Sequence, residues 1–138
     1  MDKSMYKRLS CLPLLIAALI LTFLPSGVVY NLAEEPGQVR LETFSYFDTA
    51  HFGYTNFAPL FAAIAVCVAL LLLGVHCFTQ WYWFAKAAKH FVFGGIVFSF
   101  FPLLLGVHGF STVSVLLTGF LIVELALIHF LVGEPTSK

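Results

Sequence analysis

The 138-residue chain is 60% hydrophobic, only 10% of its residues are Asp, Glu, Lys or Arg, and its formal net charge is zero. A soluble domain has charges on roughly a quarter of its residues, so this composition indicates that lipid surrounds most of the chain. The sequence has no basic patch that would indicate a nucleic-acid partner and no acidic run that would indicate a disordered tail.

Four apolar stretches are each long enough to cross a hydrocarbon core about 30 Å thick as a helix. They predict an all-α membrane protein that forms a single domain over residues 1–138. The expected spans are about 9–30, 55–78, 91–110 and 113–132.

The first stretch follows a basic start, so a cleaved signal peptide is an alternative to a retained helix. The retained helix is favoured because the apolar run continues through Val29 and no clear cleavage site follows Pro25. Pro25 and Pro102 predict kinks in the first and third spans, because each ring removes a helix hydrogen bond.

Lys and Arg residues indicate the orientation of the spans. Basic residues precede the first span, separate the second from the third (Lys86 and Lys89) and follow the fourth (Lys138), whereas the first connection has only Arg40 among four acidic residues. By the positive-inside rule, both termini are expected in the cytoplasm.

The outer loop, about 31–54, is the only sizeable segment expected outside the membrane. Within it, Gln38–Thr43 alternates apolar and polar residues as a strand does. The aromatic residues that follow are Phe44, Tyr46, Phe47, Phe52, Tyr54 and Phe57. We expect this segment to lie along the membrane surface or to fold back over the mouth of the bundle, as an interfacial anchor or as a lid that contacts a ligand.

The second connection, Thr79–Lys89, contains Trp, Tyr and Lys, which favour the headgroup level of a bilayer. It predicts an interfacial collar, with a docking surface for a partner as the alternative. Small residues four positions apart, such as Gly95 with Ser99 and Ala65 with Ala69, allow close helix approach either inside the bundle or between copies.

Glu124 is the only acidic or basic residue near the middle of a span, where a charged side chain costs about 2.5–3.5 kcal/mol on insertion scales. Counting along the spans places Thr22, Cys67 and Ser99 near its depth, and no Lys or Arg within reach. We therefore expect a protonated Glu124 that donates a hydrogen bond to Ser99 or Thr22 and holds helices together. A role in binding a proton or another cation is the alternative.

A metal site is a weaker possibility, since His76, Cys77, His90 and His129 are expected near one membrane boundary. Their spacing matches no metal motif, so neither a metal nor a cofactor is expected. The cysteines fall within or at the ends of spans, and no disulfide framework is predicted.

The segments Phe44–Asp48 and Phe52–Leu60 resemble part of a group of small, functionally uncharacterised four-helix membrane proteins of Gram-positive anaerobic bacteria. This resemblance implies a bacterial plasma-membrane protein and implies no catalytic or binding residue.

The sequence favours a non-enzymatic accessory or structural component of the membrane, in contact with the lipid bilayer and with either further copies of itself or a partner membrane protein. The competing hypothesis is a small transporter coupled to protons or cations through Glu124. A membrane enzyme is the least supported class, and a nucleic-acid partner is not expected.

Overall fold

The computed structural model describes residues 3–35, 38–48, 57–104 and 111–132. Its helices are α1 (Lys3–Leu9), α2 (Leu12–Phe23), α3 (Ala58–Thr79), α4 (Tyr82–Leu104) and α5 (Thr112–Leu131). Four segments are long and apolar enough to cross a membrane: Met5–Phe23, Ala58–Thr79, Tyr82–Phe101 and Thr112–Leu131. The predicted all-α membrane protein with four spans is therefore confirmed.

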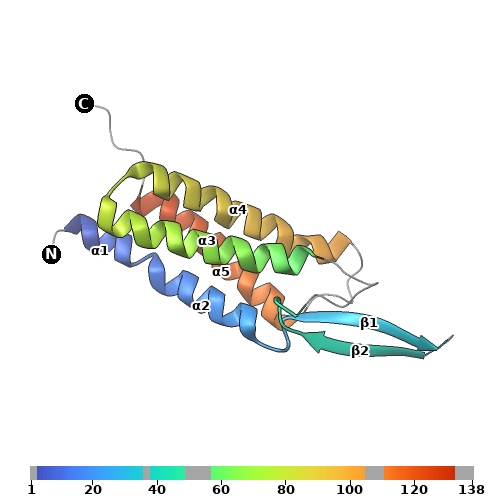
Figure 1. Ribbon diagram of the computed structural model, residues 1–138. Helices are drawn as coiled ribbons and strands as arrows, with labels where there is room; N and C mark the ends of the chain where they lie inside the picture. The colour runs from blue at the N-terminus through green and yellow to red at the C-terminus, as the bar shows by residue number, and fades with distance from the viewer. Residues whose placement is uncertain (1–2, 36–37, 49–56, 105–110, 133–138) are drawn as a thin grey trace.

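The four spans pack side by side as a bundle (Figure 1). Helix α3 packs most extensively against α4, α4 packs against α5, and α2 closes the bundle by contacting both α3 and α5. The start of α1 and the end of α5 lie at the same end of the bundle. Which side of the membrane this end faces stays a prediction.

The first span begins and ends earlier than the sequence predicted. Helix α2 ends at Phe23, and Leu24 is extended (ψ 136°), because a residue that precedes a proline avoids the helical region. Pro25 therefore follows the helix and does not kink it, which corrects the prediction for this residue. Pro102 lies within α4, close to its end.

The third span also begins earlier, since α4 starts at Tyr82. Most of the predicted collar is therefore the first two turns of α4, and its exposed Trp81 and Trp83 lie at the turn between α3 and α4. At that turn Gln80 adopts a left-handed conformation (φ 59°) and its N–H caps α3 by bonding the His76 carbonyl at 2.9 Å. The predicted end of this span, residues 105–110, lies outside the described residues.

The first connection forms an antiparallel hairpin of β1 (Val28–Glu35) and β2 (Gln38–Phe44). The strand expected over Gln38–Thr43 is confirmed, whereas a strand in place of the end of the first span was not predicted. The hairpin extends away from one end of the bundle, which we call the hairpin end (Figure 1).

After β2, the chain folds back onto the bundle. Tyr46 is buried, and the ring of Phe47 stacks on Phe23 of α2 with 4.8 Å between ring centroids. The expected fold-back over the mouth of the bundle is confirmed for these two residues, while Phe52 and Tyr54 lie outside the described residues.

Small residues allow the central helices to approach closely. A Cβ atom on Gly95 of α4 would lie 3.6 Å from Cβ of Ala65 on α3 and 3.3 Å from Cδ1 of Leu121 on α5. Ala62, Ala65 and Ala69 are buried along the facing side of α3. Around Gly95, the small-residue spacing therefore serves packing inside the bundle.

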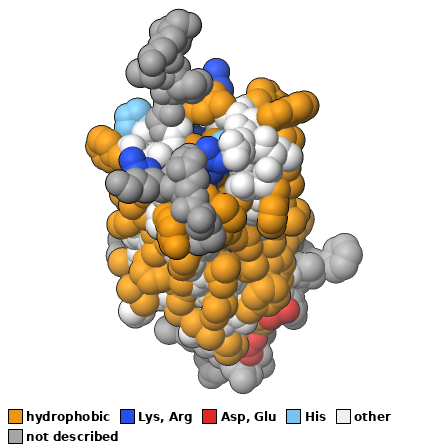
Figure 2. Space-filling model, turned by 90° about the vertical axis from the view of Figure 1, so that its left-hand side faces the viewer, with side chains coloured by type: hydrophobic (Ala, Val, Ile, Leu, Met, Phe, Trp, Pro, Cys, Tyr) orange, Lys and Arg blue, Asp and Glu red, His pale blue; other side chains and the backbone are white. Residues whose placement is uncertain are grey.

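Apart from the buried Glu124, the charged side chains of the described residues are divided between the two ends of the molecule. Figure 2 shows Lys, Arg and His side chains at one end, acidic side chains at the other, and hydrophobic side chains between them. We call the end that carries Lys7, Lys86, Lys89 and His129 the basic end. This distribution matches a helical bundle whose apolar middle lies in lipid.

Candidate functional site

Glu124 lies on the side of α5 that packs into the bundle, and none of its surface is exposed. Leu117, Leu121 and Ile128 share this side, because residues three and four positions apart lie on one face of a helix. The carboxyl group is therefore held inside the bundle, as the sequence predicted.

The hydrogen bond expected for Glu124 is not formed. Both of its carboxyl oxygens lack a hydrogen-bond partner among the residues that the structure describes, and so does Oγ of the buried Ser99. Thr22 donates instead to the carbonyl oxygen of Leu19, at 2.6 Å within its own helix. The prediction that Ser99 or Thr22 bonds Glu124 is therefore wrong.

Thr22 lies at the wrong depth to reach Glu124. Its carbonyl oxygen accepts a hydrogen bond from the N–H of Tyr46 (3.1 Å), whose hydroxyl contacts Ser114 (3.0 Å). Glu124 follows Ser114 by ten residues on α5, which is a rise of about 15 Å. The error arose because the first span was expected to continue to residue 30, which placed Thr22 near mid-membrane.

A residue of the first span that does lie near Glu124 is Cys11. This buried thiol is within electrostatic range of the Glu124 carboxyl group and of the Cys77 thiol. Cys77 is in turn within range of Arg8. Sequence reasoning did not associate Cys11 with Glu124, although an earlier end of the span would have placed them at similar depth.

Cys67, the remaining predicted site residue, is partly exposed and forms no hydrogen bond to either oxygen of Glu124. All three cysteines are free. The structure thus keeps Glu124 buried, separates it from Thr22, and leaves it unbonded to Ser99 and Cys67. A proton- or ligand-binding role for these four residues stays a prediction.

The histidines considered for a metal site have separate partners. Nδ1 of His76 donates to the carbonyl oxygen of Trp81 (2.9 Å), and Nδ1 of His90 donates to that of Lys86 (2.7 Å), because a carbonyl only accepts. Nδ1 of His129 lies 3.0 Å from Nζ of Lys89. Over the described ranges, no three His, Cys, Asp or Glu side chains are grouped to hold a metal ion.

A polar cluster that the sequence analysis missed joins the hairpin to the bundle. The Tyr46 hydroxyl donates to Oγ of Ser114 (3.0 Å), which donates to the carbonyl oxygen of Gly27 (2.8 Å). Ser111 also donates to that carbonyl oxygen (2.6 Å), and its Oγ caps α5 by accepting the N–H of Ser114 (3.1 Å). We call Gly27, Tyr46, Ser111 and Ser114 the hairpin-end cluster.

The hairpin-end cluster connects the hairpin to the bundle, and its side-chain hydroxyl groups are hydrogen-bonded. Burial raises the pKa of the Tyr46 hydroxyl, while its hydrogen bond with Ser114 acts in the opposite direction. The phenol therefore stays neutral and able to donate at neutral pH. A serine immediately before an apolar helix was the available sequence signal for the cap, but no local pattern identifies its distant partner Gly27.

Comparison of the chain with protein-family models, curated proteins and solved structures finds no match. The expected relationship to small four-helix membrane proteins of Gram-positive anaerobic bacteria stays a prediction.

Proposed function

We propose that this chain is a non-enzymatic accessory component of the cell membrane that binds a partner membrane protein through its β1–β2 hairpin. The observation that supports this proposal is the hairpin itself, which extends beyond the bundle and is fixed to it by the hairpin-end cluster (Figure 1).

An isolated two-stranded hairpin is marginally stable in water. Here β1 and β2 pair over almost their full length, from Val28↔Phe44 to Glu35↔Gln38, and neither strand pairs with a third in the described part of the chain. Their outer edges therefore offer backbone N–H and C=O groups to which a partner can add a strand. The fixed base reduces the orientational freedom that such binding would otherwise remove.

Co-purification provides the test. The tagged protein is extracted from its native membrane in mild detergent, and the associated proteins are identified by mass spectrometry. The informative variant replaces residues 31–41 with Asn-Gly, because this turn sequence can close the hairpin after the Tyr30↔Glu42 pair and leaves the hairpin-end cluster in place.

We expect a stoichiometric partner with the natural chain and its loss with the shortened hairpin. Trp83→Ala, which changes an exposed side chain at the basic end, is the control and should retain the partner. Retention of the partner by the shortened hairpin, or recovery of only a homo-oligomer, would contradict the proposal.

A proton- or cation-coupled transporter is the second candidate, favoured by the carboxyl group of Glu124. A buried polar group without a hydrogen bond costs about 1–3 kcal/mol, and more if it is charged, so its presence calls for a reason other than stability. A group that must accept and release a proton or cation provides one.

Proton flux into liposomes, followed with an entrapped pH-sensitive dye under an imposed membrane potential, tests this candidate. Glu124→Gln should abolish flux without unfolding the protein. Ser99→Ala, which changes another buried side chain without a hydrogen bond in the described part of the chain, should preserve flux. Equal flux in the natural chain and Glu124→Gln excludes the carrier.

A further inference from the structure

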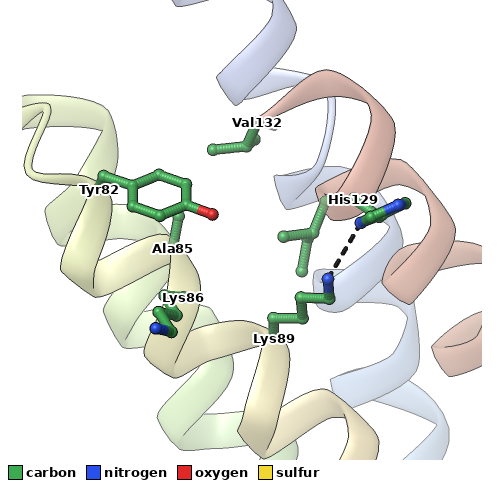
Figure 3. A pocket seen from close by; sticks show the side chains of 7 residues that line it. Tyr82, Ala85, Lys86, Lys89, His129 and Val132 are labelled. Carbon is green, nitrogen blue, oxygen red and sulfur yellow. Dashed lines mark hydrogen bonds between the residues drawn. The ribbon is translucent and has the colours of Figure 1, made fainter. Parts of the chain in front are cut away.

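A small pocket opens at the basic end of the bundle, between the first turns of α4 and the last turn of α5 (Figure 3). Its volume is about 120 Å³. One water molecule needs about 15 Å³ of such space, so the pocket can hold a phosphate group with part of its hydration shell.

The polar side chains that line this pocket are donors. Nζ of Lys89 lies 3.0 Å from Nδ1 of His129, across the gap between the two helices (Figure 3). Because an ammonium group can only donate, Nδ1 of His129 accepts, and the proton of the neutral ring is then on Nε2. Lys89 keeps two further N–H donors, and His129 keeps one.

Tyr82 and Lys86 are two further hydrogen-bond donors in the lining of the pocket. The hydroxyl group of Tyr82 points from α4 across the pocket toward α5, and Lys86 lines the pocket from the next turn of α4 (Figure 3). The remaining lining residues, Ala85, Ile128 and Val132, are apolar. No acidic side chain is among the described lining residues, so the charge of the lining favours an anion.

The position of the pocket indicates where that anion comes from. The exposed Trp81 and Trp83 lie at the same end of the bundle, and Trp favours the headgroup level of a bilayer. Phe130, next to His129, is exposed on the outer surface of the bundle. A ligand that reaches this pocket therefore has its polar group at the headgroup level and apolar chains beside the helices.

We propose that the pocket formed by Tyr82, Lys86, Lys89 and His129 binds the phosphate headgroup of an anionic phospholipid. Basic pockets between transmembrane helices commonly recognise such headgroups. The ammonium group of Lys89 pairs with a phosphate oxygen, Nε2–H of His129 and the Tyr82 hydroxyl donate to others, and the acyl chains follow the outer surface of α5. This site is independent of the hairpin and of Glu124.

The test uses the full-length protein, delipidated in a mild nonionic detergent and titrated with short-chain phosphatidylglycerol. Binding is followed by native mass spectrometry and by the fluorescence of Trp81 and Trp83. Phosphatidylcholine and inorganic phosphate are titrated in parallel, because the first presents a zwitterionic headgroup and the second a phosphate without acyl chains.

We expect saturable binding of phosphatidylglycerol that Lys89→Gln weakens by about ten-fold, equivalent to about 1.4 kcal/mol. Lys7→Gln is the matched control, since it removes the same charge from an exposed position at the same end but outside the pocket. The affinity of Lys7→Gln for phosphatidylglycerol should stay within about two-fold of the affinity of the natural chain, because salt largely screens an exposed charge outside the pocket.

Tyr82→Phe is the second variant, because it removes one donor and leaves both the net charge and the ring unchanged. We expect it to weaken binding about three-fold, consistent with the loss of one neutral hydrogen bond. A nonspecific attraction between basic side chains and anionic lipid would not respond to this change.

Three results would overturn the proposal. Equal weakening by Lys7→Gln and Lys89→Gln would show a diffuse electrostatic surface. Equal binding of phosphatidylcholine would show that the anionic headgroup is not recognised, and saturation by inorganic phosphate at the same concentrations would show a site for the free anion. Circular dichroism of each variant verifies that the helices are retained.

Discussion

The two halves of α5 differ in whether their buried polar side chains form hydrogen bonds with the described residues. At the start of α5, the hydroxyl groups of Ser111 and Ser114 both donate to the carbonyl oxygen of Gly27, and Ser114 accepts from Tyr46. Thr118 donates to the carbonyl oxygen of Ser114 at 2.8 Å. Two turns further on, Glu124 is completely buried and its carboxyl oxygens have no partner in the described part of the chain. The first arrangement stabilises the fold, whereas the second opposes it.

This difference separates structural from functional explanations for polar residues in the same helix. A satisfied group costs little to bury, so its presence is explained by the elements that it joins. An unsatisfied group lowers stability and must be retained for another reason. Substitutions at the two places should therefore change the free energy of unfolding with opposite signs.

The largest loss of stability is expected from Gly27→Ala. The added Cβ would lie 2.7 Å from Cδ2 and 3.0 Å from Cε2 of the Tyr46 ring, so the ring must move and its hydrogen bond with Ser114 is weakened. Overpacking of this kind costs about 3 kcal/mol. The free energy of unfolding is measured by titrating SDS into mixed micelles and following circular dichroism.

Gly119→Ala is the control for this change, since a Cβ at Gly119 meets no atom of the described residues within 4 Å. Replacing an exposed helical glycine with alanine should increase stability by about 1 kcal/mol. If Gly27→Ala were as stable as the natural chain, the close contact between Gly27 and Tyr46 would not hold the hairpin.

Glu124→Leu should have the opposite effect and increase the free energy of unfolding by about 2 kcal/mol. It removes a buried carboxyl group that has no hydrogen bond with any residue that the structure describes. Glu124→Gln should stay within about 0.5 kcal/mol of the natural chain, because an amide is equally unbonded there. The same SDS titration measures both variants.

Destabilisation by Glu124→Leu would reveal that the carboxyl group has a stabilising partner, and the contrast between the halves of α5 would then fail. Transport assays on the same two variants separate this outcome from the carrier hypothesis, because that hypothesis concerns flux and makes no claim about stability.

The spans themselves could be predicted because long apolar runs leave few alternatives to membrane helices. The hairpin could be predicted only in part. The alternation of Gln38–Thr43 indicates a strand, but the apolar Val28 and Val29 fit a continued helix as well as a strand, and only Pro25 indicates that the helix ends earlier.

The residues that lie beside Glu124 were harder to predict than its burial. The depth of each residue in the membrane was inferred from the expected ends of the first span. The span was expected to end at residue 30, seven residues after its observed end at Phe23. This error placed Thr22 too close to the level of Glu124 and Cys11 too far from it. The cluster of Gly27, Tyr46 and Ser114 joins residues up to 87 positions apart, and no local pattern indicates such a contact.

A smaller loss is expected from Ser114→Ala, which leaves the ring of Tyr46 in place but removes two hydrogen bonds of the hairpin-end cluster. Gly27 keeps its bond from Ser111, so the expected decrease in stability is about 1.5 kcal/mol. The exposed Thr112→Ala, in the same turn of α5, should change stability by less than about 0.5 kcal/mol. Equal effects of the two variants would indicate that the cluster contributes nothing beyond the helix start.

The smallest effect, and the one most specific to the cluster, is the pH dependence that Tyr46→Phe removes. Because burial raises the pKa of Tyr46 in the folded state, the unfolded chain loses this proton first as the pH rises through about 10. The stability that the buried hydroxyl contributes, about 1 kcal/mol, is therefore complete below pH 10 and decreases above it.

The free energy of unfolding is compared from about pH 8 to about pH 11, with the exposed Tyr6→Phe as control. The difference in the free energy of unfolding between the natural chain and Tyr46→Phe should narrow across this range. An equal narrowing for Tyr6→Phe would contradict a specific contribution from the buried hydroxyl group of Tyr46.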